Sequence, residues 1–124
     1  IKPMARILAT ANAGVEAKVM GIGPIVAVPK ALQMAGLKDS DIDYYEINEA
    51  FAVVVLCNQD TLHLDNNKLN QFGGAISIGH PIGASGARII GTTLNVLKHN
   101  GGKYGITGIC NGGGGATSII VEKI

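Results

Sequence analysis

The chain has 124 residues, of which 47% are hydrophobic and 15% are charged, and its formal net charge is +1. This apolar content excludes a disordered chain, and the near-neutral charge excludes a broad basic surface for nucleic acid. The longest apolar run, residues 50–57, is far shorter than the ~20 residues of a membrane span. We therefore expect one domain over residues 1–124, with neither a membrane nor a nucleic acid as its partner.

The first half of the chain predicts two strands and two helices. Residues 5–11 are apolar and typical of a strand. Residues 24–35 carry apolar side chains at helical spacing, and we expect the regular helix to begin at Pro29. A second strand is predicted at 41–47 and a second helix at 49–59.

The second half predicts a strand at 74–78, a helix at 86–100 and strands at 104–110 and 117–123. The last two strands are separated by a glycine loop and are expected to form an antiparallel hairpin. Strands that alternate with helices indicate an α/β domain. The sequence thus predicts a mixed, mostly parallel five-stranded sheet with helices on its faces and a C-terminal antiparallel hairpin.

A glycine-rich segment, residues 79–86, lies between the predicted strand and the predicted helix. Its spacing fits neither a Walker A loop nor a Gly-x-Gly-x-x-Gly motif. His80 precedes Pro81, which restricts it to extended geometry at the mouth of a helix. The positive end of the helix dipole there favours a neutral imidazole that can act as a base. The alternative is a histidine that is satisfied by backbone groups in a tight turn.

Asn48 follows a predicted strand and is the second candidate. One interpretation is an N-cap of the following helix, with Glu49 in its first turn. The other is a side-chain amide that orients a water molecule or an oxyanion.

Cys110 ends a predicted strand and is followed by Asn111 and four glycines. Glycine allows close approach of backbone N–H groups to a substrate. Cys110 is therefore a candidate acid or base for proton transfer to or from a carbon atom. The alternative is that Cys110 is a small buried hydrophobic residue. That second interpretation is preferred for Cys57, which lies within the predicted helix, while His63 and His99 are expected on the surface. No Cys/His spacing indicates a metal site.

Three segments together resemble one known family. They are residues 48–52, 73–88 and 110–114, and they resemble the C-terminal half of the thiolases, that is, the acetyl-CoA acetyltransferases and 3-ketoacyl-CoA thiolases. The resemblance covers nearly the whole chain. It implies a thiolase-like half fold and a role as the C-terminal catalytic half of an acyltransferase, which acts on CoA thioesters by Claisen condensation or thiolytic cleavage of 3-ketoacyl-CoA.

The resemblance also implies a role for each candidate. His80 activates a nucleophilic cysteine that belongs to an N-terminal half not included in this chain. Cys110 moves the proton on the α-carbon of the second thioester. Asn48 positions a water molecule in the oxyanion hole of the enolate, and the backbone N–H of Gly112 contributes to the other oxyanion hole.

Met20 and Phe51 are the substrate-binding residues that the resemblance implies. No cofactor and no metal is expected, since the CoA thioester is the substrate. The expected partners are the N-terminal thiolase half of the same chain and, for the full-length protein, one or three further copies in a homodimer or homotetramer. The chain opens with Ile1 and shows no targeting segment, so for a bacterial source the expected compartment is the cytoplasm.

Two other interpretations remain. The chain could be a thiolase-like binding or assembly module without turnover. A ketoacyl synthase is disfavoured, because decarboxylating relatives use a second histidine where Cys110 stands. Without the nucleophile of the N-terminal half, the chain alone is expected to be inactive.

Overall fold

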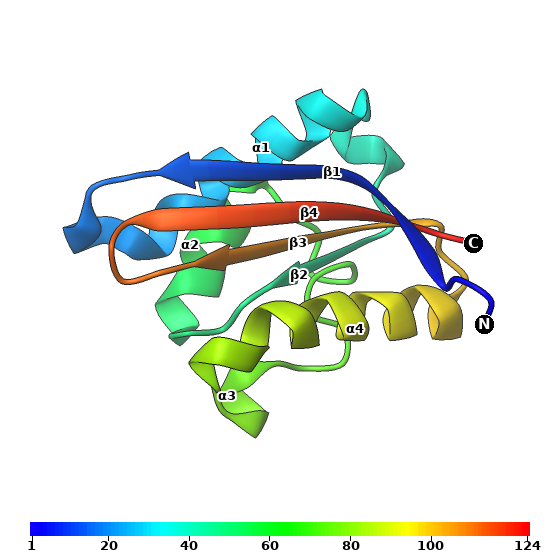
Figure 1. Cartoon of the computed structure of the whole chain (residues 1–124). Coiled ribbons are helices and arrows are strands. Elements are labelled where there is room, and N and C mark those ends of the chain that lie inside the picture. The colour runs from blue at the N-terminus through cyan, green and yellow to red at the C-terminus, as the bar shows by residue number, and fades with distance from the viewer.

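The computed structural model describes all 124 residues and contains one four-stranded sheet. The strand order across the sheet is β1-β4-β3-β2, so the last strand in the sequence lies between the first and the third (Figure 1). Strands β2 and β3 are parallel, whereas β4 is antiparallel to both of its neighbours. The strands are β1 (Ala5–Gly14), β2 (Tyr44–Ile47), β3 (Tyr104–Cys110) and β4 (Gly115–Lys123).

Helices cover both faces of this sheet. The helix α1 packs on one face and the helix α4 on the other, and α2 lies on the α1 side beside the 3-10 helix η1 (Figure 1). No helix combines the length and the apolar character that crossing a membrane requires. The helical segments are η1 (Ala17–Ile22), α1 (Gly23–Ala35), η2 (Asp39–Asp41), α2 (Ala52–Leu62), α3 (Ala75–Ile78) and α4 (Ile82–Asn100).

The alternation of side chains along β2 separates an apolar face from a polar one. Tyr45 and Ile47 join the main apolar core beneath α1. Glu46 and Asn48, which alternate with them, line a cavity beneath α4. The α4 helix approaches the sheet closely at Gly105, where an added Cβ would lie 2.2 Å from Cγ2 of Thr93. The short edge strand therefore directs polar side chains toward α4.

The predicted strand at residues 74–78 is wrong, because this segment is the single helical turn α3. A short, mainly apolar segment does not distinguish a strand from a helical turn by its periodicity. Here Gly73 has a φ of +73°, which turns the chain, and the amide of Ile76 donates to the carboxylate of Glu49. The sheet consequently has four strands and not five.

The prediction of a mostly parallel sheet is also wrong, since only β2 and β3 are parallel. Alternation of strands and helices favours parallel pairing, but β4 returns directly from β3 as a hairpin. That hairpin is confirmed, and β1 then adds to the outer edge of β4. The α/β class is confirmed. The sheet differs from the predicted, mostly parallel one because the first strand, β1, pairs antiparallel with β4.

Three helix starts differ from the prediction, and one of them is that of α4, which begins at Ile82 and not at residue 86. The helix α1 begins at Gly23 and continues through Pro29. Proline fixes φ near the helical value, and the N–H that it lacks leaves one hydrogen bond of the helix unmade. The helix α2 begins at Ala52, and Asn48 lies four residues earlier without a capping hydrogen bond. The N-cap interpretation of Asn48 is therefore wrong.

Candidate functional site

The carboxyl ends of β2 and β3 meet at a cavity of about 430 Å³ that is lined by ten residues. Five of the six residues singled out in the sequence line this cavity: Met20, Phe51, His80, Cys110 and Gly112. The sixth, Asn48, reaches it through a contact with His80. Segments distant in the sequence are therefore brought together at one end of the sheet.

Hydrogen bonds on both sides hold His80 in place. Nη1 of Arg88 donates to the carbonyl of Gly79 at 2.9 Å, and Nδ1 of His80 lies 2.6 Å from Oγ of Ser85. The Ser85 hydroxyl donates its single proton to the carbonyl of Pro81 at 3.2 Å. We therefore assign the tautomer in which Nδ1 donates to this hydroxyl, so that in the neutral ring Nε2 is the nitrogen without a proton. The network prepares Nε2 to act as a base.

Asn48 is 2% exposed and extends the pairing of β2 with β3, because its amide donates to the carbonyl of Gly108 at 2.8 Å. Its side-chain Nδ2 lies 3.4 Å from Nε2 of His80. Its Oδ1 is buried and has no hydrogen-bond partner in the chain. A buried amide oxygen without a partner is unfavourable, so this group suits a ligand or a water molecule at the cavity.

Cys110 ends β3 and is 8% exposed, and burial raises the pKa of its thiol. The following turn is organised by Asn111, whose Oδ1 accepts from the amides of Gly113 and Gly115 and whose carbonyl accepts from the amide of Gly114. The amide of Gly112 makes no hydrogen bond within the chain. It is thus a backbone donor available at the cavity.

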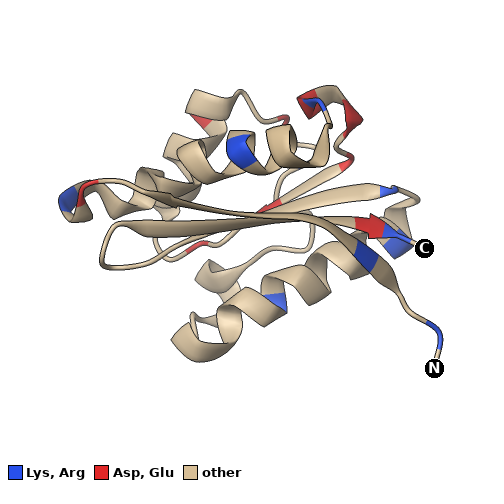
Figure 2. Cartoon of the chain, turned by 45° about the horizontal axis from the view of Figure 1, so that its top comes forward, with Lys and Arg blue, Asp and Glu red and all other residues tan.

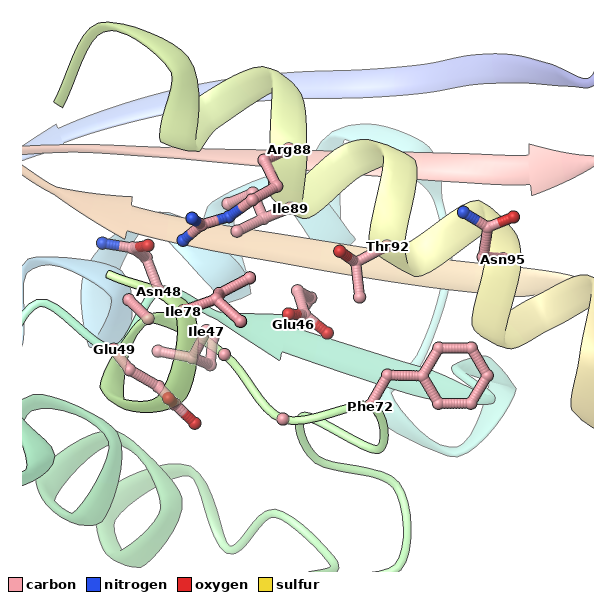
Figure 3. A pocket seen from close by; sticks show the side chains of 13 residues that line it. Glu46, Ile47, Asn48, Glu49, Phe72, Ile78, Arg88, Ile89, Thr92 and Asn95 are labelled. Atoms are coloured by element: carbon pink, nitrogen blue, oxygen red, sulfur yellow. The ribbon is translucent and has the colours of Figure 1, made fainter. Parts of the chain in front are cut away.

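A second, smaller cavity of about 120 Å³ lies between the end of β2 and α4. Figure 3 shows Glu46 and Thr92 facing this space and the guanidinium of Arg88 extending toward Asn48. Burial, together with the charge of Glu49, raises the pKa of Glu46 to about 8, and the charge of Arg88 opposes this shift. Glu46 is therefore a buried carboxyl group that keeps its proton at neutral pH.

The other two histidines and Cys57 do not line the larger cavity. His63 and His99 are exposed, and Cys57 is partly buried within α2. No three acidic, histidine or cysteine side chains lie together in a way that could hold a metal ion. Figure 2 shows charged residues scattered along the ribbon without a continuous basic face.

Sequence reasoning missed the role of Ser85, although it lies within the singled-out segment 79–86. The signal was a hydroxyl residue five positions after a pre-proline histidine. In the structure Ser85 lies in the first turn of α4, and its hydroxyl is therefore next to the ring of His80.

Comparison with known proteins relates this site to one family. Residues 1–123 match the family model described as "Thiolase, C-terminal domain". The chain is 54% identical over 124 residues to the mitochondrial acetyl-CoA acetyltransferase of Xenopus tropicalis, of which it covers 29%. It is 50% identical over 125 aligned residues to the acetyl-CoA acetyltransferase of Saccharomyces cerevisiae, of which it covers 31%.

Solved structures agree with this relationship. The chain superposes in full on the acetyl-CoA acetyltransferase of Bacillus anthracis with a TM-score of 0.97 and 41% identity, and covers 32% of that chain. For the human mitochondrial 3-ketoacyl-CoA thiolase the TM-score is 0.96 and the identity 42%, with 99% of this chain and 31% of that chain covered. The chain spans about a third of the length of these relatives, and it belongs to the thiolase family, in which it corresponds to the C-terminal domain.

Proposed function

We propose that this chain supplies the C-terminal catalytic residues of an acyltransferase that exchanges acyl groups between CoA thioesters. The observation that carries the proposal is the convergence of four chemical groups at one cavity. These are the unprotonated Nε2 of His80, the amide of Asn48, the thiol of Cys110 and the free N–H of Gly112.

The first step is acylation of a nucleophilic cysteine from the N-terminal part that the relatives carry. His80 Nε2 takes the thiol proton, while the bond from Nδ1 to Ser85 keeps the ring in the required tautomer. The thiolate attacks the carbonyl carbon of an acyl-CoA. The CoA thiolate then leaves and takes the proton of the Cys110 thiol, which leaves Cys110 as a thiolate, while His80 keeps the proton on Nε2. The N–H of Gly112 is placed to stabilise the oxyanion formed in this attack.

The second step requires a base beside the α-carbon of another thioester. The Cys110 thiolate removes the α-proton, and the buried environment that raises its pKa makes the thiolate a stronger base. Two donors support the enolate oxygen, namely the Nε2–H that His80 gained in the first step and a water molecule bound to the Asn48 amide. The enolate carbon attacks the acyl carbon and expels the cysteine thiolate, which takes its proton back from His80. Thiolytic cleavage is the reverse sequence.

Met20 and Phe51 line the same cavity and are the proposed contacts of the acyl-CoA. The proposed chemistry needs neither a cofactor nor a metal, because acid, base and oxyanion donors suffice. The full-length protein is proposed to assemble as a homodimer or homotetramer.

Exposed apolar side chains support a covering N-terminal part. Ile76, Ile78 and Ile82 are 65%, 66% and 85% exposed on the α3 side of the site. An apolar patch of this kind marks a contact surface.

The experiment compares residues 1–124 alone with the same chain joined to an N-terminal thiolase part. Consumption of acetoacetyl-CoA with free CoA is followed by the enolate absorbance. We expect turnover only for the joined protein, because the chain alone lacks the nucleophile. A joined protein that folds but shows no turnover would favour a non-catalytic thiolase-like module instead. Turnover by the chain alone that is lost in Cys57→Ser would contradict both the proposal and the interpretation of Cys57.

A further inference from the structure

A polar bridge joins the segment that carries Asn48 to the segment that carries His80. We propose that Asn70 and Glu49 are positioning residues, which set the separation between the Asn48 amide and the His80 ring. The inference rests on the proposed function, because the contact that it concerns is the proposed enolate-stabilising pair.

The first part of the bridge covers the free edge of β2. Backbone pairing with residues 68–70 ends at Asn70, whose amide donates to the carbonyl of Tyr45 at 2.9 Å. The Asn70 side chain continues the pattern, since its Oδ1 accepts from the amide of Ile47 at 2.8 Å and its Nδ2 donates to the carbonyl of Ile47 at 2.9 Å. This side chain acts as an additional peptide group directly before Asn48.

The second part of the bridge is the carboxylate of Glu49. Its Oε1 accepts from Nδ2 of Asn70 at 3.1 Å, and its Oε2 accepts from the amide of Ile76 at 2.9 Å. Gly74 allows this approach, because an added Cβ would lie 2.6 Å from Cδ of Glu49. Glu49 thus connects the end of β2 to the turn α3.

The bridge has a geometric consequence at the site. The turn α3 ends at Ile78, two residues before His80. The 3.4 Å contact with His80 is the only hydrogen-bonding contact of the Asn48 side chain. A displacement of about 1 Å in a catalytic arrangement can reduce a rate by about 10²-fold. A small shift of Glu49 or Asn70 therefore changes the distance between Asn48 Nδ2 and His80 Nε2.

The test uses the joined, full-length protein with Asn70→Asp, Glu49→Gln and the double variant. In Asn70→Asp two carboxylates face each other and the donor is lost. The double variant restores the hydrogen bond between positions 49 and 70 with its direction reversed, because the new side-chain amide at position 49 donates to the new carboxylate at position 70. The carbonyl of Ile47 still lacks its donor in this variant. Gln71→Glu is the matched control, since it makes the same chemical change at an exposed neighbour.

The readout is exchange of the α-protons of acetyl-CoA with deuterated water, measured beside acylation and KM. We expect exchange to fall about 10²-fold in Asn70→Asp, with KM and acylation of the nucleophile little changed. Recovery of about tenfold is expected in the double variant, and Gln71→Glu should match the unaltered protein. A purely structural role at β2 would give no recovery, because the contact with Ile47 stays broken.

Unchanged exchange in Asn70→Asp, or a double variant no better than that single variant, would overturn the inference. If Asn70→Asp does not fold, Glu49→Gln takes its place, and we expect the rate of α-proton exchange to fall about tenfold in that variant. An unchanged exchange rate in Glu49→Gln would also overturn the inference. Absence of exchange in the unaltered protein would refute the proposed function alone. The inference is then decided by crystal structures of the variants, which must show a longer separation between Asn48 Nδ2 and His80 Nε2 than the unaltered protein.

Discussion

The two ends of the sheet differ in how completely their polar groups are paired. At the end where β3 begins, Oδ2 of Asp43 accepts from the amides of Lys103 and Tyr104 at 2.7 and 2.8 Å. Glu122 pairs there with both Arg6 and Lys103. At the opposite end, by contrast, Asn48 Oδ1 and the amide of Gly112 lack partners.

This difference separates a closed end from an open one. Polar groups at the closed end are used to hold loops together, which contributes to stability. Groups at the open end are held in position by neighbours but keep a free donor or acceptor. The buried Asn48 Oδ1 is unfavourable without a partner, and together with the unpaired amide of Gly112 it supports the proposed substrate site at this end. Changes at the two ends should accordingly affect different measurements.

The largest expected effect is at the open end, on replacing His80 by Ala in the full-length protein. Loss of the base should reduce acylation of the nucleophile by about 10²–10⁴-fold, while the melting temperature changes little. Trapping with a labelled acyl-CoA measures the acylation. Normal covalent labelling of the variant would remove His80 from the proposed mechanism.

The next effect is expected for Asn48→Asp. A carboxylate beside a developing enolate should slow α-proton exchange by about 10²–10³-fold. Acylation is the internal control, since it does not form the enolate. Equal losses in exchange and acylation would mean that the change disrupts the site as a whole.

At the closed end, Asp43→Ala should affect stability and not turnover. Two backbone amides lose their acceptor, so we expect the free energy of unfolding to fall by about 2 kcal/mol. Urea unfolding measures this change. Asp65→Ala is the matched control, because the carboxylate of Asp65 accepts only from Asn67 in an exposed loop. A loss as large as that of Asp43→Ala would contradict the comparison.

The smallest expected effect is the pH dependence due to Glu46. The folded chain holds this proton to about pH 8, whereas the unfolded chain releases it near 4.5. The unfolded state therefore binds fewer protons within this interval, and the free energy of unfolding falls as pH rises, by at most about 1.4 kcal/mol per pH unit. Urea unfolding at pH 6 and 7 should show a smaller decrease for Glu46→Gln. An identical decrease would place the titrating group elsewhere.

Residue patterns predicted the class of the fold, the hairpin and most of the elements, because these depend on local apolar periodicity. The pairing of β1 with β4 was not predictable in this way, since it joins residues more than 100 positions apart. The turn α3 was mistaken for a strand because its conformation depends on Glu49, which is distant in sequence.

The candidate residues followed from motifs, but their partners did not. His80, Cys110 and Gly112 share a cavity as the motifs suggested. The bonds of His80 to Ser85 and of Asn70 to Ile47 and Glu49 depend on side-chain orientation after folding. Asn48 shows the limit most clearly, because the sequence allowed an N-cap that the true start of α2 excludes.

The position of β4 in the sheet has a consequence for biosynthesis. This strand separates β1 from β3, and among the elements of this sheet it is synthesised after the other three. Until β4 emerges, β1 lacks the strand with which it pairs in the folded domain, and the layer beneath α1 remains open. Non-local pairing of this kind slows folding and prolongs the exposure of apolar side chains. Assembly of this sheet therefore depends on β4, and its apolar side chains stay accessible to chaperones until that strand appears.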